Sequence, residues 1–345
     1  MSWCAWCGGG AGGLGRREFL SLVGQAALAA GVLPRRAEAL SIYDEAGDVK
    51  IGEEADPEIL KRFGYYEGPE LQAYVAQVGG QLIRNADTRF NFQFKVVDHP
   101  SINAMALPGG FVYITRGILA EMNDEAQLAG ILGHEITHVN SRHSAKLLTK
   151  AFGTQLATIL GIGAAAASGS PGAATSIAMI SRHVGTYMLL GYGREFELEA
   201  DEVGLRYARR AGYDPRRMVV FLRALRRREI LRGQSMYHAL DATHPDTAQR
   251  MAKADTMANL LIAEGGPLEI KADAYKAALE GLRYGEARDQ RRLRIYTVKA
   301  GDTLASIARE EMRDEGQRYE LASLNGLADD AVLTPGTRLK LIVKN

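Results

Sequence analysis

The fold of this chain is decided by residues 123–140, which read NDEAQLAGILGHEITHVN. The stretch opens as a helix start, because Asn123 can cap the first turn and two acidic residues follow at the positive end of the helix dipole. Apolar residues then recur at three- and four-residue steps on one face, namely Leu128, Ile131, Leu132, Ile136 and Val139. The sequence therefore predicts a helix that packs this face against a core.

Two histidines stand four residues apart inside this helix. His134 and His138 share a helix face at that spacing, so both imidazoles can reach one metal ion. Glu135 is offset by about 100° around the helix and can take a proton from water at that ion. The pattern predicts a hydrolytic centre with one Zn²⁺ per chain, and zinc then needs a third protein ligand that leaves one position for water.

The third ligand is expected further along the chain. His143 follows His138 by five residues and falls on another face of the helix, which argues against it. Residues 197–201 read ELEAD on a separate predicted helix, and they make Glu197 the better candidate. Asp201 lies four residues later on the same face, where it can accept a hydrogen bond from the free N–H of a ligand histidine.

A short sheet is expected before the metal helix. Residues 103–110 read NAMALPGG and residues 111–115 read FVYIT, so a Pro-Gly-Gly turn separates two short apolar runs and predicts a hairpin. Proline confines its own strand to an edge. Residues 90–97 alternate like a half-buried strand, and residues 55–90 and 195–210 look helical, with a further helix starting at Asp214-Pro215. The expected class is α+β, mostly helical with a small sheet.

These motifs resemble the HtpX-like and CAAX-prenyl-endopeptidase-type zinc metallopeptidases, and within them the periplasmic BepA-like branch. The family pattern is matched by His134, Glu135, His138, Glu197, Ala200 and Asp201, and its edge-strand pattern by residues 103–110. The resemblance implies a zincin-type metallopeptidase domain over residues 45–260 that hydrolyses peptide bonds. It also implies that zinc is held by the two histidines and Glu197, and that Glu135 is the general base.

The resemblance carries two further implications for the site. An extended substrate is implied to pair with the edge strand by β-augmentation, through Asn103, Ala104, Met105, Ala106, Gly109 and Gly110. Residues 243–245 read THP, and the resemblance implies that His244 lies near the metal with Arg250 behind it. His244 is either a removable fourth ligand that latches the site or a catalytic group that faces the reacting carbonyl, and both roles stay open.

Residues 293–345 resemble a LysM module, a binder of N-acetylglucosamine chains such as peptidoglycan. Strand, capped helix, second helix and closing strand fit a βααβ unit, and residues 261–292 before it are expected to be a helical linker. The resemblance places glycan contacts near Gly301, Asp302, Thr303 and Asn325. A purely structural or autoregulatory remnant is the alternative to glycan binding.

The first 39 residues are predicted to be an export signal. Arg16 and Arg17 precede an apolar run that ends in a small-residue cleavage site, a pattern that resembles a twin-arginine signal and implies a periplasmic location. Both cysteines lie within the first seven residues, so a disulfide framework is excluded. The 42 basic and 41 acidic residues create no general basic field, which argues against nucleic acid as a partner.

Residues 151–181 contain no formally charged side chain. A Ser/Gly/Pro break divides this run into pieces too short to span a bilayer, so either an internal helix pair or a peripheral membrane contact fits it.

The leading hypothesis is a periplasmic zinc endopeptidase that degrades misfolded or unassembled envelope polypeptides and is tethered near peptidoglycan. A wall-anchored chaperone or assembly factor with a latched metal site, and a murein peptide hydrolase, are the alternatives.

Overall fold

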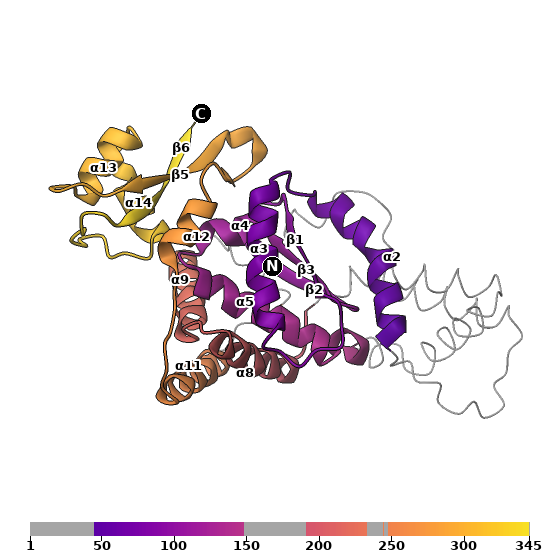
Figure 1. Cartoon of the computed structure of the whole chain (residues 1–345). Coiled ribbons are helices and arrows are strands. Elements are labelled where there is room, and N and C mark those ends of the chain that lie inside the picture. Colours follow the sequence, from indigo (N-terminus) through magenta and orange to yellow (C-terminus); the bar gives the residue numbers. More distant parts are fainter. Residues whose placement is uncertain (1–44, 148–190, 233–243, 245–247, 345) are drawn as a thin grey trace, which may run out of the picture. The chain divides into compact units, whose positions relative to one another are not determined.

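The computed structural model describes residues 45–147, 191–232, 244 and 248–344 (Figure 1). The expected signal at 1–39 and the uncharged run 151–181 lie outside these ranges. Among the described helices, none combines the length and apolar character needed to cross a bilayer. Most of the described elements are helices, and the strands form two small sheets, which confirms the expected α+β class.

Two helices, α2 (Glu45–Phe63) and α3 (Pro69–Ile83), occupy most of the region where the sequence predicted helix over 55–90. The chain breaks between them at Gly64, whose φ of 76° lies in the left-handed region that glycine adopts readily. Pro69 then begins α3, because its ring fixes φ at a helical value and the first turn has no use for its missing N–H.

The first sheet contains β1 (Gln93–Val97), β2 (Ala104–Leu107) and β3 (Phe111–Thr115) in the order β1-β3-β2. β2 and β3 form the expected hairpin, with Leu107 opposite Phe111. Gly109 in its turn has a φ of 83°, and a Cβ there would lie 2.5 Å from the Cα of Val49 in α2. Within the described residues β2 pairs on one side only, yet none of its residues is more than 3% exposed.

The short helix α4 (Arg116–Glu121) leads into α5 (Glu125–Asn140), which carries both histidines. The predicted helix is confirmed, but its cap is Asp124, whose carboxylate accepts the N–H of Gln127. Asn123 instead donates its backbone N–H to the Gln127 side chain. α5 is buried on every side, not on one face, because α3, α8, α9 and the sheet all pack against it.

Figure 1 shows α8 (Arg194–Arg210) alongside α5, with α9 (Arg216–Arg232) and α11 (Ala248–Ala263) next to them. Two glycines allow the close approach of α5 and α8. A Cβ on Gly133 would lie 2.7 Å from the carbonyl oxygen of Gly204, and a Cβ on Gly204 would lie 2.6 Å from the backbone nitrogen of His134. The helices α5 and α8 are therefore in backbone contact at this crossing point.

The C-terminal module has the expected βααβ order, with β5 (Arg291–Thr297), α13 (Leu304–Glu311), α14 (Arg318–Leu324) and β6 (Arg338–Lys344). Residues 261–292 are only partly helical, contrary to expectation. They include α12 (Ala272–Ala278) and β4 (Arg283–Tyr284), which extends the module's sheet to β4-β5-β6. The physical reason is burial, since Leu279, Leu282 and Tyr284 join the core instead of crossing solvent. Two single turns of 3₁₀ helix complete the module, η1 (Ala287–Asp289) and η2 (Glu315–Gln317).

A fully buried lysine joins this module to the rest of the described chain. The ammonium of Lys340 donates hydrogen bonds to the carbonyl oxygens of Ala120 (2.7 Å) and Met122 (2.5 Å), at the end of α4. Asn325 holds the backbone of Lys340, accepting its N–H at 2.8 Å and donating to its carbonyl at 2.9 Å. A cation at a helix C-terminus is favoured by the helix dipole and satisfies carbonyls that the helix itself leaves unpaired.

Candidate metal centre

The two histidines of α5 point their Nε2 atoms toward the same place. The Nε2 atoms of His134 and His138 are 3.0 Å apart, and their rings meet edge to face with centroids 4.7 Å apart. Both side chains are buried. The spacing of four residues thus brings the two imidazoles together as the sequence predicted.

Glu197 from α8 completes a three-residue set. Its Oε2 lies 3.5 Å from the Nε2 of His134, and its Oε1 lies 3.5 Å from the Nε2 of His138. The carboxylate is fully buried. Burial alone would raise the pKa of Glu197, but the adjacent His244 and His134 outweigh it and hold the pKa well below its usual range. Glu197 is therefore an anion, as a metal ligand must be.

His244 brings a fourth donor atom to the same point. Its Nδ1 lies 3.0 Å from Glu197 Oε1 and 3.2 Å from His134 Nε2. Its backbone carbonyl accepts a hydrogen bond from Arg250 Nη1. The structure therefore brings together every residue that the sequence placed at the metal.

The donor set fits a zinc ion. The four donor atoms all lie within 4.8 Å of one another, and they are imidazole nitrogens and a carboxylate oxygen, which zinc prefers. Ligand atoms about 2.0–2.1 Å from a tetrahedral ion lie roughly 3.3 Å apart, which matches the separations of 3.0–3.5 Å found here. Three of these residues could hold the ion in a catalytic site, and the fourth, His244, places its Nδ1 beside the same point.

A buried ion-pair network orients the donors from outside. Asp201 accepts a hydrogen bond from His134 Nδ1 at 2.9 Å. Arg250 donates two more hydrogen bonds to the Asp201 carboxylate, from Nε (2.6 Å) and from Nη2 (2.9 Å). Arg250 Nη1 also lies 2.7 Å from Glu197 Oε2. Burial would lower the pKa of His134, but its hydrogen bonds to Asp201 and Glu197 raise it to about 9. The Arg250 guanidinium therefore contacts Glu197, Asp201 and the backbone carbonyl of His244 at the same time.

Glu135 occupies the position expected of a general base. It is buried, and its Oε1 lies 3.4 Å from His244 Nε2. Its Oε2 has no hydrogen-bond partner among the described residues. Burial raises the pKa of Glu135, which makes this carboxylate a stronger base than an exposed one.

Sequence reasoning missed the residues around the outer side of His138. His143 contacts His138 through an Nδ1–Nδ1 distance of 2.9 Å, and Tyr192 stacks on the His138 ring at 3.9 Å between centroids. The sequence argued against His143 as a metal ligand, and the structure agrees, because the chain turns back after α5 and presents His143 to the far side of His138. Its pKa is lowered to about 4 by burial, so it is a neutral hydrogen-bonding group at neutral pH. Tyr192 carried no pattern in the sequence that could have identified it.

The predicted substrate strand is buried in this structure. Asn103 exchanges backbone and side-chain hydrogen bonds with Thr115 of β3. Its neighbours in the predicted set are buried as well, namely Ala104, Met105, Ala106, Gly109 and Gly110. In this arrangement these residues offer almost no exposed surface to an extended substrate.

The predicted glycan-contacting residues serve the fold of the C-terminal module. Asp302 accepts hydrogen bonds from the Lys299 N–H and the Tyr296 hydroxyl, and Thr303 caps α13. The amide of Asn325 is committed to the main chain, as described above. Gly301 has a φ of 86° beside them, in the left-handed region. Glycan binding by these residues stays a prediction.

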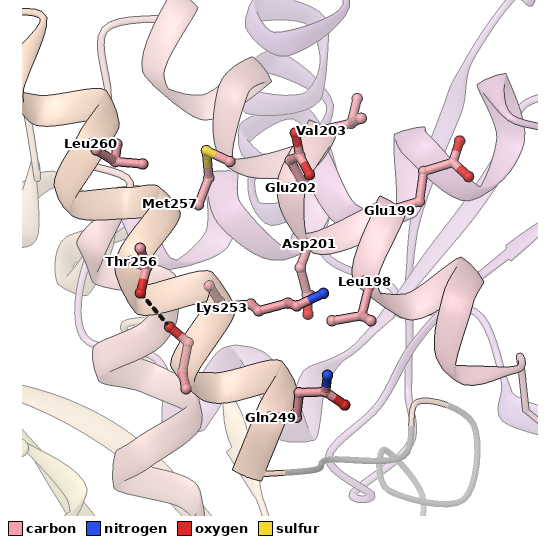
Figure 2. Close-up of a pocket in the computed structure, with 12 residues that line it drawn as sticks. Leu198, Glu199, Asp201, Glu202, Val203, Gln249, Lys253, Thr256, Met257 and Leu260 are labelled. Carbon is pink, nitrogen blue, oxygen red and sulfur yellow. Dashed lines mark hydrogen bonds between the residues drawn. The ribbon is translucent and has the colours of Figure 1, made fainter.

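A pocket of about 730 Å³ lies between α8 and α11, next to the metal centre (Figure 2). None of the four donor residues lines it. Among its lining residues, Asp201 contacts the donor His134 and Glu199 lies beside His143, and these two side chains leave α8 in different directions in Figure 2. The pocket is therefore separate from the place where a reacting peptide bond would lie.

Comparison with known proteins identifies two families in this chain. The sequence model of peptidase family M48 matches residues 69–258, and that of the LysM domain matches residues 296–341. The beta-barrel assembly-enhancing protease of Escherichia coli (strain K12) is 29% identical over 235 residues, which cover 64% of this chain and 46% of the relative. The mitochondrial metalloendopeptidase OMA1 of Bos taurus is 31% identical over 175 residues, which cover 49% of this chain and 33% of that relative.

This chain thus spans about half or less of the length of these two curated relatives. The family match, in contrast, covers more than half of the chain and includes the residues that converge on the candidate metal position. The chain therefore belongs to peptidase family M48, and its residues 296–341 form a LysM domain.

Proposed function

We propose that this chain is a zinc-dependent endopeptidase that hydrolyses peptide bonds of misfolded or unassembled proteins of the cell envelope. The observation that carries the proposal is the buried Glu135 beside the donors His134, His138 and Glu197. A purely structural zinc site has no use for a general base at this position. The printed names of the relatives, a protease and a metalloendopeptidase, support the reaction class.

The chain's own residues supply binding, orientation and proton transfer. A bound zinc ion supplies Lewis acidity where the three donors converge. Glu135 takes the proton of the attacking water and returns it to the leaving amine, and its raised pKa suits both steps near neutral pH. Asp201 fixes the His134 ring through Nδ1, and Arg250 keeps Asp201 ionised and holds Glu197 in place through an ion pair.

Three features support the location and the substrates. The predicted export signal at residues 1–39 supports a periplasmic protein. The LysM domain supports tethering near peptidoglycan. The relative from Escherichia coli is named for enhancing β-barrel assembly, which supports polypeptides of the envelope as substrates. Such chains are extended when unassembled, and an edge strand binds extended chains with little sequence preference.

The experiment compares the zinc-loaded protein with its Glu135→Gln variant on an unfolded protein substrate. Removing the carboxylate removes the general base but none of the donors, so the variant should keep zinc and lose at least about a hundredfold in cleavage rate. Zinc content is measured by atomic emission and cleavage by the appearance of new amino termini. A Glu135→Gln variant that cleaves at the full rate would refute the proposed mechanism.

The same assay separates the alternatives. A chaperone or assembly factor would suppress aggregation of the unfolded protein without creating new termini, and Glu135→Gln would do so equally well. A murein peptide hydrolase would release stem peptides from purified peptidoglycan and leave the unfolded protein intact. Either result would replace the proposed function.

We propose further that His244 latches the site. Its Nδ1 takes the fourth position of the donor set, and its Nε2 faces Glu135, so in this arrangement it occupies the place of the reacting water. The burial of β2 is consistent with the same closed arrangement. Releasing His244 would open the fourth position without disturbing the other three donors.

The latch is tested by His244→Ala in the cleavage assay. Removing the fourth donor should raise the cleavage rate several-fold, because the position for water is then always open. Zinc content should stay at one ion per chain, since three donors remain. Equal or lower activity in this variant would favour the other role, in which His244 assists at the reacting carbonyl.

A further inference from the structure

The outer nitrogen of His138 faces a second imidazole. The Nδ1 atoms of His138 and His143 are 2.9 Å apart, a hydrogen-bonding distance, and the two rings meet edge to face at 4.9 Å between centroids. His143 is fully buried and is not one of the four donors that could hold the metal. It therefore belongs to the layer behind a ligand, where His134 has Asp201.

A tight turn delivers His143 to this position. α5 ends at Asn140, and Arg142 then adopts a φ of 52°, which is uncommon for a residue with a side chain. Its guanidinium Nε donates to Asp48 of α2 at 2.5 Å, which stabilises the turn. The His143 ring stacks on Phe196 of α8 at 4.5 Å and 17°. Local strain is thus held by contacts from two other helices, as is common at functional sites.

The hydrogen bond between His138 and His143 determines which nitrogen of each ring carries the proton. A ligand histidine binds metal through the lone pair of the nitrogen that faces the ion, which for His138 is Nε2. Its proton then resides on Nδ1 and points at His143. His143 must accept with its own Nδ1, so its proton resides on Nε2. Two neutral rings are thereby fixed in complementary tautomers.

Glu199 lies beside the nitrogen that carries this second proton. Its Oε2 is 3.3 Å from His143 Nε2, a nitrogen that forms no hydrogen bond with any of the described residues in this arrangement. Ser141 donates to the other oxygen of Glu199 at 2.5 Å and holds the carboxylate near the turn. The Glu199 side chain is 44% exposed, so it can rotate to accept the proton.

We infer that His143 is a positioning residue for the metal ligand His138, and that Glu199 in turn orients His143. The inference rests on the ligand set proposed above. The two ligand histidines are then supported differently: His134 by a buried carboxylate, and His138 by a neutral imidazole that leads to a carboxylate at the surface. Partners of this kind fix the tautomer and the ring orientation of a ligand.

The test compares His143→Phe and His143→Asn in the full-length protein. Phenylalanine keeps the ring that stacks on Phe196 but has no acceptor, whereas asparagine keeps an acceptor at the place of Nδ1. Zinc affinity is measured by competition with a chelator, and the absorption spectrum of the Co²⁺ form reports the ligand geometry. His143→Phe should bind zinc about 10–100-fold more weakly with an altered cobalt spectrum. His143→Asn should recover most of the affinity and the wild-type spectrum.

A matched pair of variants on α8 tests the role of Glu199. Glu199→Ala should lower zinc affinity several-fold, whereas Glu202→Ala, which removes an exposed carboxylate three residues later, should leave it unchanged. If His143→Phe does not fold, this pair decides the question, and equal affinities for the two variants overturn the inference. Wild-type affinity in His143→Phe, or an equal loss in His143→Asn, also overturns it.

These outcomes are distinct from a failure of the proposed function. If wild-type protein binds no zinc, or if Glu135→Gln still cleaves, the proposed function fails. If wild-type protein binds zinc and cleaves but His143→Phe binds zinc normally, only the role of His143 fails.

Discussion

At the scale of single residues, His134 is subject to opposing influences. Burial favours its neutral ring, whereas hydrogen bonds to Asp201 and Glu197 favour the charged ring and raise the pKa to about 9. Zinc binds the neutral form of histidine, so in the metal-free protein it must displace a proton from His134 at neutral pH. The same carboxylates that hold the site together without metal are those that orient the ring once metal binds.

The pH dependence of stability in the metal-free protein follows from this shift. The pKa of His134 is higher in the folded state than its ordinary 6.5, so its charged form stabilises the fold fully below about pH 6.5 and this contribution is lost as the pH rises through about 9. Between pH 6 and 9.5 we expect the free energy of unfolding to fall by on the order of 3 kcal/mol. Urea denaturation of chelator-treated protein measures the change.

The control is His134→Asn, which keeps a donor to Asp201 but cannot titrate. Its free energy of unfolding should vary less over the same pH range, and the difference between the two curves isolates His134. If both proteins lose stability equally between pH 6 and 9.5, the shift in the His134 pKa is contradicted.

At the scale of elements, the position of Glu197 depends on how closely α8 approaches α5. The approach is possible because Gly133 and Gly204 have no side chains at the crossing point, where backbone meets backbone. Only at this distance does the carboxylate of α8 come within 3.5 Å of both imidazoles of α5. Packing between two helices thus sets the geometry of the metal centre.

Gly204→Ala should therefore disturb the metal centre from a distance. The new Cβ would lie 2.6 Å from the backbone nitrogen of His134, so α8 must shift outward and take Glu197 with it. We expect zinc affinity to fall at least about tenfold, and stability to fall by about 1–3 kcal/mol from overpacking. Chelator competition and urea denaturation measure the two effects.

Gly193→Ala at the N-cap of the same helix is the matched control, because a Cβ there would meet nothing within 4 Å and its φ of −74° suits any residue. This variant should bind zinc like the wild type. Wild-type zinc affinity in Gly204→Ala would show that the close approach of the helices is not required.

At the scale of the whole molecule, the described part of the C-terminal module packs directly on the peptidase domain. Lys340 takes part in this contact, with no exposed surface and with its ammonium shared between the carbonyls of Ala120 in α4 and of Met122 just after it. α4 leads through Asn123 and Asp124 into the metal helix α5. The LysM domain therefore stabilises the end of α4, the helix that precedes α5 with its two histidines.

Lys340→Met should uncouple this contact while it preserves the apolar stem. Two buried carbonyls would lose a charged donor, which we expect to cost about 2–4 kcal/mol of stability. Urea denaturation measures the loss, and Lys344→Met at the exposed end of the same strand is the control. Equal stability of the two variants would show that the module is not held by Lys340.

The sequence by itself determined the parts that depend on local spacing. Four-residue steps placed His134 and His138 on one side of α5, and they placed Glu197 and Asp201 on one side of α8. The Pro-Gly-Gly turn specified the β2–β3 hairpin, and the alternation of strand and helix signals specified the C-terminal βααβ unit. Periodicity and turn chemistry act over a few residues, so they can be read without the fold.

Only the tertiary structure decided the parts that depend on contacts between distant segments. His244 meets His134 from 110 residues away, and Arg250 meets Asp201 from 49 residues away. The family resemblance implied that both lie near the metal, but no local pattern in the sequence encodes these contacts. His143 is close to His138 in sequence, yet its role depends on the left-handed turn at Arg142 and on packing from α2 and α8. Side chains so placed are held by burial and long-range packing, and local sequence patterns do not encode either one.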